Sequence, residues 1–366
     1  MQQLPAADTG PVFGVHGLVC YPLLKSRRLS ILALLLVALL VVWHPARVAV
    51  QALVLLPALF PNAPVDPLAL VTAPPIRSEH PFVYAAGNVE ATIFHPSSGG
   101  EHGALILLLG AGDLPRSDLA VHFAEALARL GVVVMLPQST GLAEERLTFG
   151  EVDALRVSFV TLAGQPDVDQ RRVGFVGLSA AGGLSIVAAG QPDLRDRVRF
   201  VNSFGSYYDA TSLLLDVASR SMELDGREVP WQPETRTQEV IAHSLAEADS
   251  PELRELLGGT TRARARELIG RMPVAMVERL RQISPSAYLS QVKAHLYLMH
   301  DVDDTFIPYV ESRALAQAAP PGVVERYTEF SIFAHVIPDR PVPWQTFLPD
   351  LWRLYWHVHA VLLEVL

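Results

Sequence analysis

The sequence is poor in the residues on which several large classes of protein depend. It contains one cysteine, Cys20, which excludes an intramolecular disulfide and a cysteine-based metal site. No pair of histidines has the spacing of metal ligands. A Gly-x-Gly-x-x-Gly run and a Walker pattern, the usual signals of nucleotide binding, are also absent. The formal net charge of -9 argues against nucleic acid, whose phosphates demand a basic surface. We therefore predict no metal, no cofactor and no nucleic-acid partner.

Lysine is scarce as well: Lys25 and Lys293 are the only two, while arginine is common. This bias is typical of GC-rich genomes and indicates a bacterial source. Half of the residues are hydrophobic, a high proportion for a soluble protein. We therefore expect part of the chain to contact lipid.

The strongest apolar run is Leu29–Trp43, which is 15 residues long and follows the basic segment 25–28. A membrane-spanning helix needs about 20 residues, so the run suffices only if it continues past Trp43, with Arg47 extending to the interface. Because basic residues precede the run, the positive-inside rule places residues 1–28 in the cytoplasm and the chain after about residue 60 outside. We expect a single-pass anchor in the bacterial cytoplasmic membrane.

Two other interpretations of this region stay open. The run is also compatible with a cleaved signal peptide, with a passable cleavage site at Val50–Ala52. It is equally compatible with a hairpin that uses the second apolar stretch, Val48–Phe60. A buried helix of a soluble domain is disfavoured, because a helix that is apolar all round needs apolar neighbours on every side.

The remainder of the chain alternates short apolar strands with amphipathic helices. The predicted strands are 89–94, 104–109, 132–136, 173–176, 199–204, 294–299 and 325–330. The predicted helices are 118–130, 152–163, 180–189, 311–319 and 350–366. This alternation predicts an α/β fold with a mostly parallel central sheet that is covered by helices on both faces.

The alternation breaks between residues 205 and 290, where the sequence becomes charged and helix-prone. We interpret this stretch as a helical cap inserted into the sheet domain. The predicted organisation is a cytoplasmic tail (1–28), a membrane anchor region (29–60), a proline-rich linker (61–79) and an α/β domain (80–366) that contains the cap (205–290).

Ser179 lies between a predicted strand and a predicted helix, in the stretch Gly177-Leu-Ser-Ala-Ala181. Residues without bulk around a serine indicate that the backbone turns sharply and packs closely there. The stretch resembles the nucleophile elbow of the α/β-hydrolase family, whose pattern is Gly-x-Ser-x-Gly, with Ala181 in the last place. The simpler interpretation is a serine that caps an ordinary helix.

In that family the acid and then the histidine follow the serine along the chain. The stretch His300-Asp-Val-Asp-Asp-Thr-Phe-Ile-Pro308 resembles the family's His-Gly-x-x-Asp-x-x-Val-Pro and implies Asp304 as the acid. Asp303 stays open as the rival. His335, preceded by Ala334, matches the family's Gly-His and is the implied base.

The resemblance also implies an oxyanion hole. One N–H would come from Ala180, directly after the nucleophile, and the other from Ala111 in Leu109-Gly-Ala-Gly112, which resembles the family's His-Gly-x-Gly. The pieces are most similar to the dienelactone-hydrolase and acyl-esterase branch. They imply a membrane-anchored serine esterase that acts on a small-molecule ester without a cofactor.

Two alternatives remain. One is a thioesterase or peptidase with the same three catalytic residues, and the other is a catalytically silent binding protein, which the departures at Leu109, Ala181 and Asp301 leave open. The closing helix 350–366 is apolar on nearly all sides. We expect its outer face to rest on the bilayer or on a partner.

Overall fold

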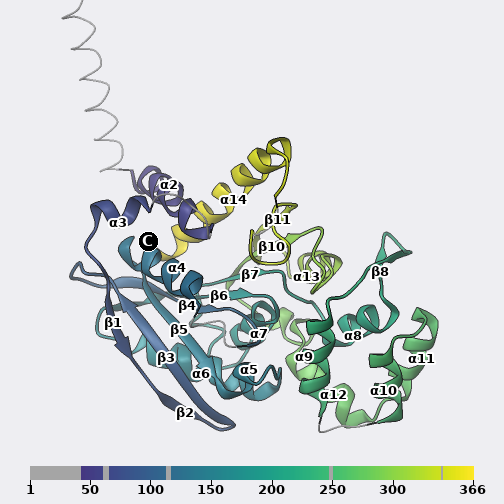
Figure 1. Cartoon of the computed structure of the whole chain (residues 1–366). Coiled ribbons are helices and arrows are strands. Elements are labelled where there is room, and N and C mark those ends of the chain that lie inside the picture. The colour runs from purple at the N-terminus through teal and green to yellow at the C-terminus, as the bar shows by residue number, and fades with distance from the viewer. Residues whose placement is uncertain (1–42, 61–65, 113–116, 247–249, 339–340) are drawn as a thin grey trace, which may run out of the picture. The chain divides into compact units, whose positions relative to one another are not determined.

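The computed structural model describes residues 43–60, 66–112, 117–246, 250–338 and 341–366 (Figure 1). The predicted cytoplasmic tail and the predicted membrane run up to residue 42 lie outside these ranges. Within them, no helix combines the length and the hydropathy that crossing a bilayer requires.

A central sheet organises the chain. Across the described ranges it has nine strands, of which eight follow the order β1-β3-β5-β4-β6-β7-β10-β11, with β2 paired to β3. The six strands from β5 to β11 run parallel, whereas β1, β2 and β3 pair antiparallel at one edge. Their bounds are β1 Ile76–Glu79, β2 Phe82–Tyr84, β3 Gly87–His95, β4 His102–Leu108, β5 Val133–Ser139, β6 Val168–Leu178, β7 Phe200–Phe204, β10 His295–Asp301 and β11 Val324–Phe330. The predicted mixed α/β fold with a mostly parallel sheet is confirmed.

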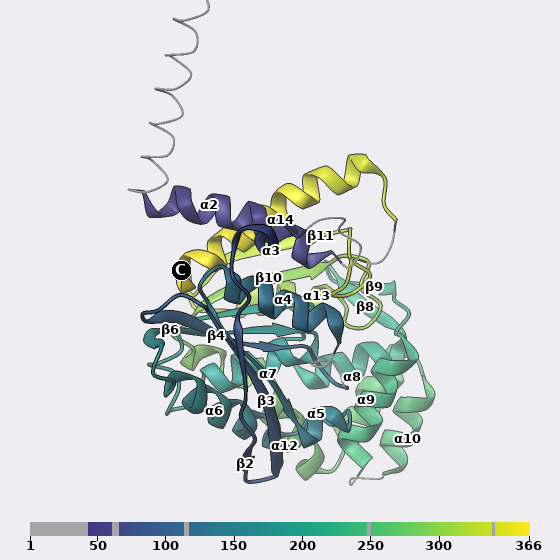
Figure 2. The ribbon, with the colours of Figure 1, turned by 60° about the vertical axis from the view of Figure 1, so that its left-hand side comes forward.

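Helices cover both faces of this sheet (Figure 2). Successive side chains of a strand point to opposite faces, so Leu105 and Leu107 of β4 pack in one apolar core and Ile106 and Leu108 in another. The first core is completed by α4 (Asp118–Arg129) and α14 (Trp344–Val365), and the second by α6 (Phe149–Ala163) and α7 (Ala180–Ala189). The short α5 (Thr140–Ala143) follows β5, and α13 (Val310–Ala318) follows β10.

The chain between β7 and β10 forms the predicted insertion. It contains α8 (Ala210–Ser219), α9 (Thr235–Leu245), α10 (Pro251–Gly258), α11 (Arg262–Arg271) and α12 (Val274–Ile283). It also contains an antiparallel hairpin, β8 (Ser221–Leu224) and β9 (Arg227–Pro230), which the sequence analysis did not predict. The helices group beside the parallel half of the sheet (Figure 1).

The N-terminal boundary of the domain differs from the prediction. α2 (His44–Leu55) continues into the 3-10 helix η1 (Leu56–Leu59), and Val48, Ala52 and Leu55 are at most 1% exposed. They pack in the same core as Leu127 of α4 and Leu362 of α14. The compact unit therefore begins at Val48, so residues 48–60 of the predicted anchor region belong to the sheet domain. The apolar face of α2 could contact either lipid or a protein core, because both environments are hydrophobic. In this structure it packs on the sheet domain.

The predicted linker is likewise only partly a linker. α3 (Pro67–Val71) begins at an Asp66 side chain that accepts hydrogen bonds from the main chain of Leu68 and Ala69. β1 then pairs with β3 from Ile76 onward. The sheet therefore begins before residue 80, at a strand that is too short and too exposed to show an apolar pattern.

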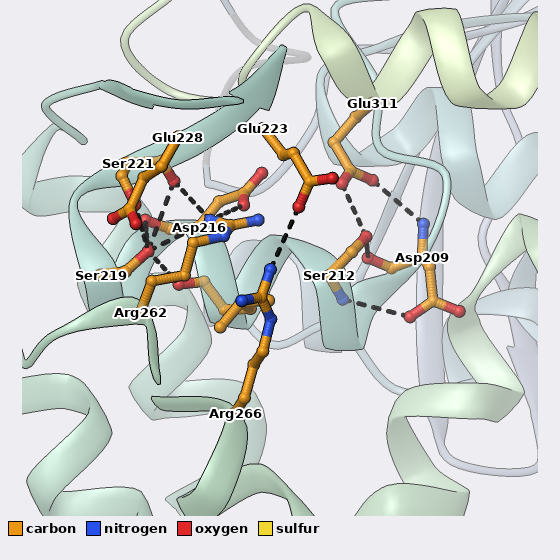
Figure 3. Close-up of polar contacts among 11 residues, drawn as sticks. Asp209, Ser212, Asp216, Ser219, Ser221, Glu223, Glu228, Arg262, Arg266 and Glu311 are labelled. Carbon is orange, nitrogen blue, oxygen red and sulfur yellow. Dashed lines mark hydrogen bonds and ion pairs between the residues drawn. The ribbon is translucent and has the colours of Figure 1, made fainter. Parts of the chain in front are cut away.

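Buried polar contacts attach the insertion to the sheet domain (Figure 3). Within the insertion, the Arg262 guanidinium donates to the Asp216 carboxylate at 2.7 Å, and both side chains are less than a tenth exposed. Glu311 on α13 accepts from the hydroxyl of Ser212 at 2.6 Å and from the main-chain N–H of Tyr208 at 2.8 Å. The Glu311 carboxyl therefore fixes the start of α8. Its burial, together with the charge of Asp216, raises the pKa of Glu311 to about 7.

This raised pKa predicts a pH dependence of stability. The ordinary pKa of a glutamate is 4.5, so the stabilisation from protonated Glu311 is complete below pH 4.5 and is lost as the pH rises to about 7. Glu311→Gln removes the charge; its amide oxygen can still accept from the main chain of Tyr208, and its NH₂ group can donate to the Ser212 hydroxyl. We expect this variant to be more stable than wild type at pH 8 by up to ~3 kcal/mol and nearly equal to it at pH 4.5. Urea unfolding at both pH values measures this difference. Glu101→Gln, at an exposed position, is the control. If the difference in free energy of unfolding between Glu311→Gln and wild type were the same at both pH values, the prediction would be contradicted.

Candidate active site

Ser179 occupies a sharp turn between β6 and α7. Its φ of 57° and ψ of -141° are strained for a residue with a side chain. Its main-chain N–H donates to the carbonyl of Phe204 at 2.7 Å, which fixes the turn against the next strand. The Ser179 side chain makes no capping hydrogen bond to α7. The geometry is therefore that of an elbow and not that of a serine helix cap.

The small residues around Ser179 are required by close packing. A Cβ added at Gly177 would lie 2.6 Å from the Cα of Gly182, and a Cβ added at Gly182 would lie 2.4 Å from the Oγ of Ser203. Neither position has room for a side chain. Ala181, which replaces the last glycine of the family pattern, fits with its side chain fully buried.

The structure brings Asp304 and His335 together. The Asp304 Oδ2 lies 2.5 Å from the His335 Nδ1, and the Asp304 side chain is fully buried. The other oxygen, Oδ1, accepts from the main-chain N–H groups of Phe306 and Ile307 at 2.7 and 3.1 Å. Asp303, the rival acid, is exposed. The geometry therefore favours Asp304 as the partner of the histidine.

The environment keeps Asp304 ionised. Burial alone would raise the pKa of this carboxyl, but its electrostatic attraction to His335 and its hydrogen bonds with His300 and His335 outweigh burial and hold the pKa well below its usual range. An ionised acid at this distance accepts the N–H of His335 Nδ1. The Nε2 atom of the same ring is left as the atom able to take up a proton.

The His335 ring lies at the same sheet edge as Ser179. A Cβ added at Gly205, the residue after Phe204, would lie 3.3 Å from the Cε1 of His335. Phe306 stacks on the ring with a centroid distance of 4.6 Å. The His335 Nε2 is buried and has no hydrogen-bond partner among the described residues, so Ser179 does not hydrogen-bond to it here. Such bonds are often long until a substrate is bound.

Three further residues support the acid, and the sequence analysis did not assign them to the site. The His300 Nε2 lies 3.2 Å from the Asp304 Oδ2, so this histidine, which begins the stretch that contains the predicted acid, helps to hold the carboxylate. Asp301 accepts from the main-chain N–H of Phe333 at 2.7 Å and so joins the acid loop to the histidine loop. Trp231 of the insertion donates from Nε1 to the carbonyl of Asp304 at 2.8 Å.

The two predicted oxyanion donors belong to segments that adjoin Ser179. Ala180 is the first residue of α7, and N–H groups of the first turn have no partner within a helix. Gly110 adopts a φ of 94°, and a Cβ there would lie 3.2 Å from the Cβ of Ser179, so the loop that carries Ala111 approaches the serine closely. The Ala111 carbonyl accepts from Arg236 of the insertion at 3.4 Å. The assignment of the two N–H groups stays a prediction.

Comparisons with known proteins agree on the fold. No family model and no curated protein sequence matches the chain. Among solved structures, a 2,6-dihydroxy-pseudo-oxynicotine hydrolase matches 79% of this chain and 69% of its own at 15% identity, with a TM-score of 0.52. A protein from Bacteroides ovatus assigned as a dipeptidyl aminopeptidase IV matches 80% of this chain and 36% of its own at 12% identity, with a TM-score of 0.50. The chain therefore spans about two thirds of the first protein and about a third of the second. With its strand order and its elbow, this chain has the α/β-hydrolase fold.

Proposed function

We propose that this chain is a serine hydrolase that cleaves carboxylic esters. The observation that carries the proposal is the buried Asp304–His335 pair, whose free Nε2 lies at the same sheet edge as the strained Ser179. A serine hydroxyl is a weak nucleophile until a base takes its proton, and the base needs a third group to orient it. The three side chains supply these three roles.

The reaction would proceed in two halves. The Oγ of Ser179 attacks the ester carbonyl carbon while the Nε2 of His335 takes the hydroxyl proton. The same nitrogen then gives that proton to the leaving alkoxide, which departs as an alcohol and leaves an acyl-serine. A water molecule repeats the sequence on the acyl-serine, giving the carboxylic acid and free Ser179. Asp304 stabilises the imidazolium in both halves without becoming protonated.

The N–H groups of Ala180 and Ala111 would bind the oxyanion that develops on the carbonyl oxygen. One such donor is typically worth about 3–4 kcal/mol of barrier. The fixed helix start at Ala180 and the left-handed Gly110 before Ala111 support this role.

The fold does not give the substrate. A thioester or an amide would use the same residues, and one of the similar structures named above is assigned as a dipeptidyl aminopeptidase. A panel of p-nitrophenyl esters, acyl-thioesters and peptide amides tests the proposal. We expect ester hydrolysis to exceed amide hydrolysis by orders of magnitude in kcat/KM. If only amides or only thioesters are hydrolysed, the protein is a peptidase or a thioesterase. If no substrate of the panel is hydrolysed, a catalytically silent binding protein is favoured.

We also propose that residues 29–43 tether the domain to the bacterial cytoplasmic membrane, on its outer side. The basic segment before the apolar run supports this orientation. The outer face of α14 supports contact with the membrane as well. Large apolar side chains are exposed there: Trp344 68%, Leu348 53%, Trp352 61% and Trp356 36%. Tryptophan favours the membrane interface.

A truncated protein tests this membrane contact. Removal of residues 1–42 leaves the compact unit that begins at Val48. We expect this protein to bind liposomes weakly, and we expect Trp344→Ala together with Trp352→Ala to reduce that binding about tenfold or more, because buried aromatic area is lost. Co-sedimentation with vesicles measures the effect. Val160→Ala, at an exposed apolar position of α6, is the control, and equal binding by both variants would contradict the prediction.

A further inference from the structure

An apolar cavity of about 180 Å³ lies between the sheet and the elements α4, α14 and η1. Its walls come from separate parts of the chain: Leu55 and Ala58 before the sheet, Ala120 on α4, and Val358 and Val361 on α14. An apolar cavity of about 150 Å³ is large enough to hold a benzene-sized molecule and stays dry when empty. This cavity is therefore suited to a hydrocarbon ligand.

The polar side chains at the cavity satisfy one another. The Nε2 of His357 donates to the Oδ1 of Asn202 at 2.8 Å, and its Nδ1 accepts from the hydroxyl of Thr328 at 2.9 Å. Burial lowers the pKa of His357 to about 3, so the ring is neutral at ordinary pH. A charged group in the cavity would therefore lose its hydration without gaining a partner.

Four residues that line the cavity are chain neighbours of residues at the candidate active site. Leu178 precedes Ser179, Val336 follows His335, Leu109 precedes Gly110, and Phe204 precedes Gly205. Each of these four neighbours lines the cavity. Phe204 also accepts the main-chain hydrogen bond of Ser179. One end of the cavity therefore lies beside the main chain of the elbow and of His335, although the side chains of Ser179 and His335 do not line it.

We propose that this cavity binds the acyl chain of the substrate, so that the enzyme acts on esters of medium-length unbranched fatty acids. This inference rests on the proposed esterase function. The carbonyl group would stay at Ser179 and the hydrocarbon tail would pass between Leu178 and Val336 into the cavity. Because η1 follows the predicted membrane run in the chain, the segment after the tether forms one wall of the acyl site.

The dependence of rate on acyl length tests the proposal with the full-length protein in detergent. We expect kcat/KM for p-nitrophenyl esters to rise from acetate by up to about fourfold per methylene, the equivalent of ~0.8 kcal/mol, until the cavity is filled. Ala58→Leu and Ala120→Leu add side-chain carbons from two different walls. Each should lower the ratio of octanoate to acetate kcat/KM at least tenfold. Ala318→Leu, at an exposed position on α13, should leave the ratio unchanged.

A binding measurement separates the cavity from the chemistry. Ser179→Ala protein should bind octanoic acid, as measured by calorimetry, and addition of Ala58→Leu or Ala120→Leu should weaken that binding at least tenfold. If the wild type hydrolyses no ester but Ser179→Ala binds the fatty acid, and Ala58→Leu or Ala120→Leu removes that binding, the proposed esterase function is overturned and the acyl-chain site is retained. If the protein hydrolyses esters but Ala58→Leu and Ala120→Leu change neither the ratio of octanoate to acetate kcat/KM nor the binding of the fatty acid, the acyl-chain site alone is overturned.

Discussion

Ser179→Ala is expected to lower ester hydrolysis by about 10⁵- to 10⁶-fold and to abolish labelling by a fluorophosphonate probe. The hydroxyl is the atom that would form the acyl bond, and no other group at the elbow can replace it. Residual activity above water is expected, since the oxyanion donors and the binding site remain. Labelling followed by gel fluorescence, beside steady-state kinetics, measures both effects.

The control for this experiment is Ser97→Ala, at an exposed position after β3. It should be labelled like the wild type. Labelling that persists in Ser179→Ala would place the reactive nucleophile elsewhere. Absence of labelling in a folded wild-type protein would favour the silent binding protein instead.

The second large effect is expected at Asp304. Asp304→Asn keeps the shape and can still accept from the main chain of Phe306, but its amide does not stabilise the imidazolium and does not hold His335 in the required tautomer. We expect kcat to fall by about 10⁴-fold with little change in KM. Circular dichroism and a thermal melt establish that the variant is folded before its kinetics are compared.

Asp303→Asn is the matched control, one residue away and exposed. Its kcat should stay within a few-fold of the wild type. If Asp303→Asn were the inactive variant and Asp304→Asn the active one, the acid would be Asp303, and the pairing of Asp304 with His335 would not be the catalytic one.

The parts of the fold that could be predicted from sequence are those with local patterns. Buried parallel strands such as 104–109 and 173–176 are continuous apolar runs, and the helices between them show apolar faces with regular spacing. Ser179 was recognisable because its glycine and alanine neighbours are constrained by packing within the same turn. Asp304 and His335 could be assigned because each lies in a short stretch that resembles a family pattern.

The N-terminal segment shows where such reasoning fails. Val48–Phe60 is apolar, and hydropathy does not distinguish a helix face that meets lipid from one that meets α4 and α14. The β8–β9 hairpin is polar and mostly exposed, so it has no alternating pattern. Its turn did carry a signal, since Asp225 and Gly226 both have positive φ and Asp-Gly is a favoured dipeptide in two-residue hairpins.

The supporting residues of the site could not be predicted for a different reason. Trp231 and Asp304 are 73 positions apart in the chain, and their contact depends on how the insertion folds back on the sheet. Asp301 appeared as a departure from the family pattern, although it holds Phe333 of the histidine loop. Single-sequence patterns report local geometry, whereas these contacts are tertiary.

The hydrogen bond from Trp231 to the Asp304 carbonyl limits how the inserted segment can be exchanged, both in protein engineering and during the evolution of related sequences. An inserted segment is commonly regarded as an exchangeable module that selects substrates while the sheet keeps the chemistry. Here the module also holds Asp304, the proposed acid, so its replacement would release the loop that contacts His335. A graft that retained Trp231 and its approach to Asp304 would preserve turnover while altering selectivity. The same bond limits which insertions can accumulate at this place without loss of catalysis.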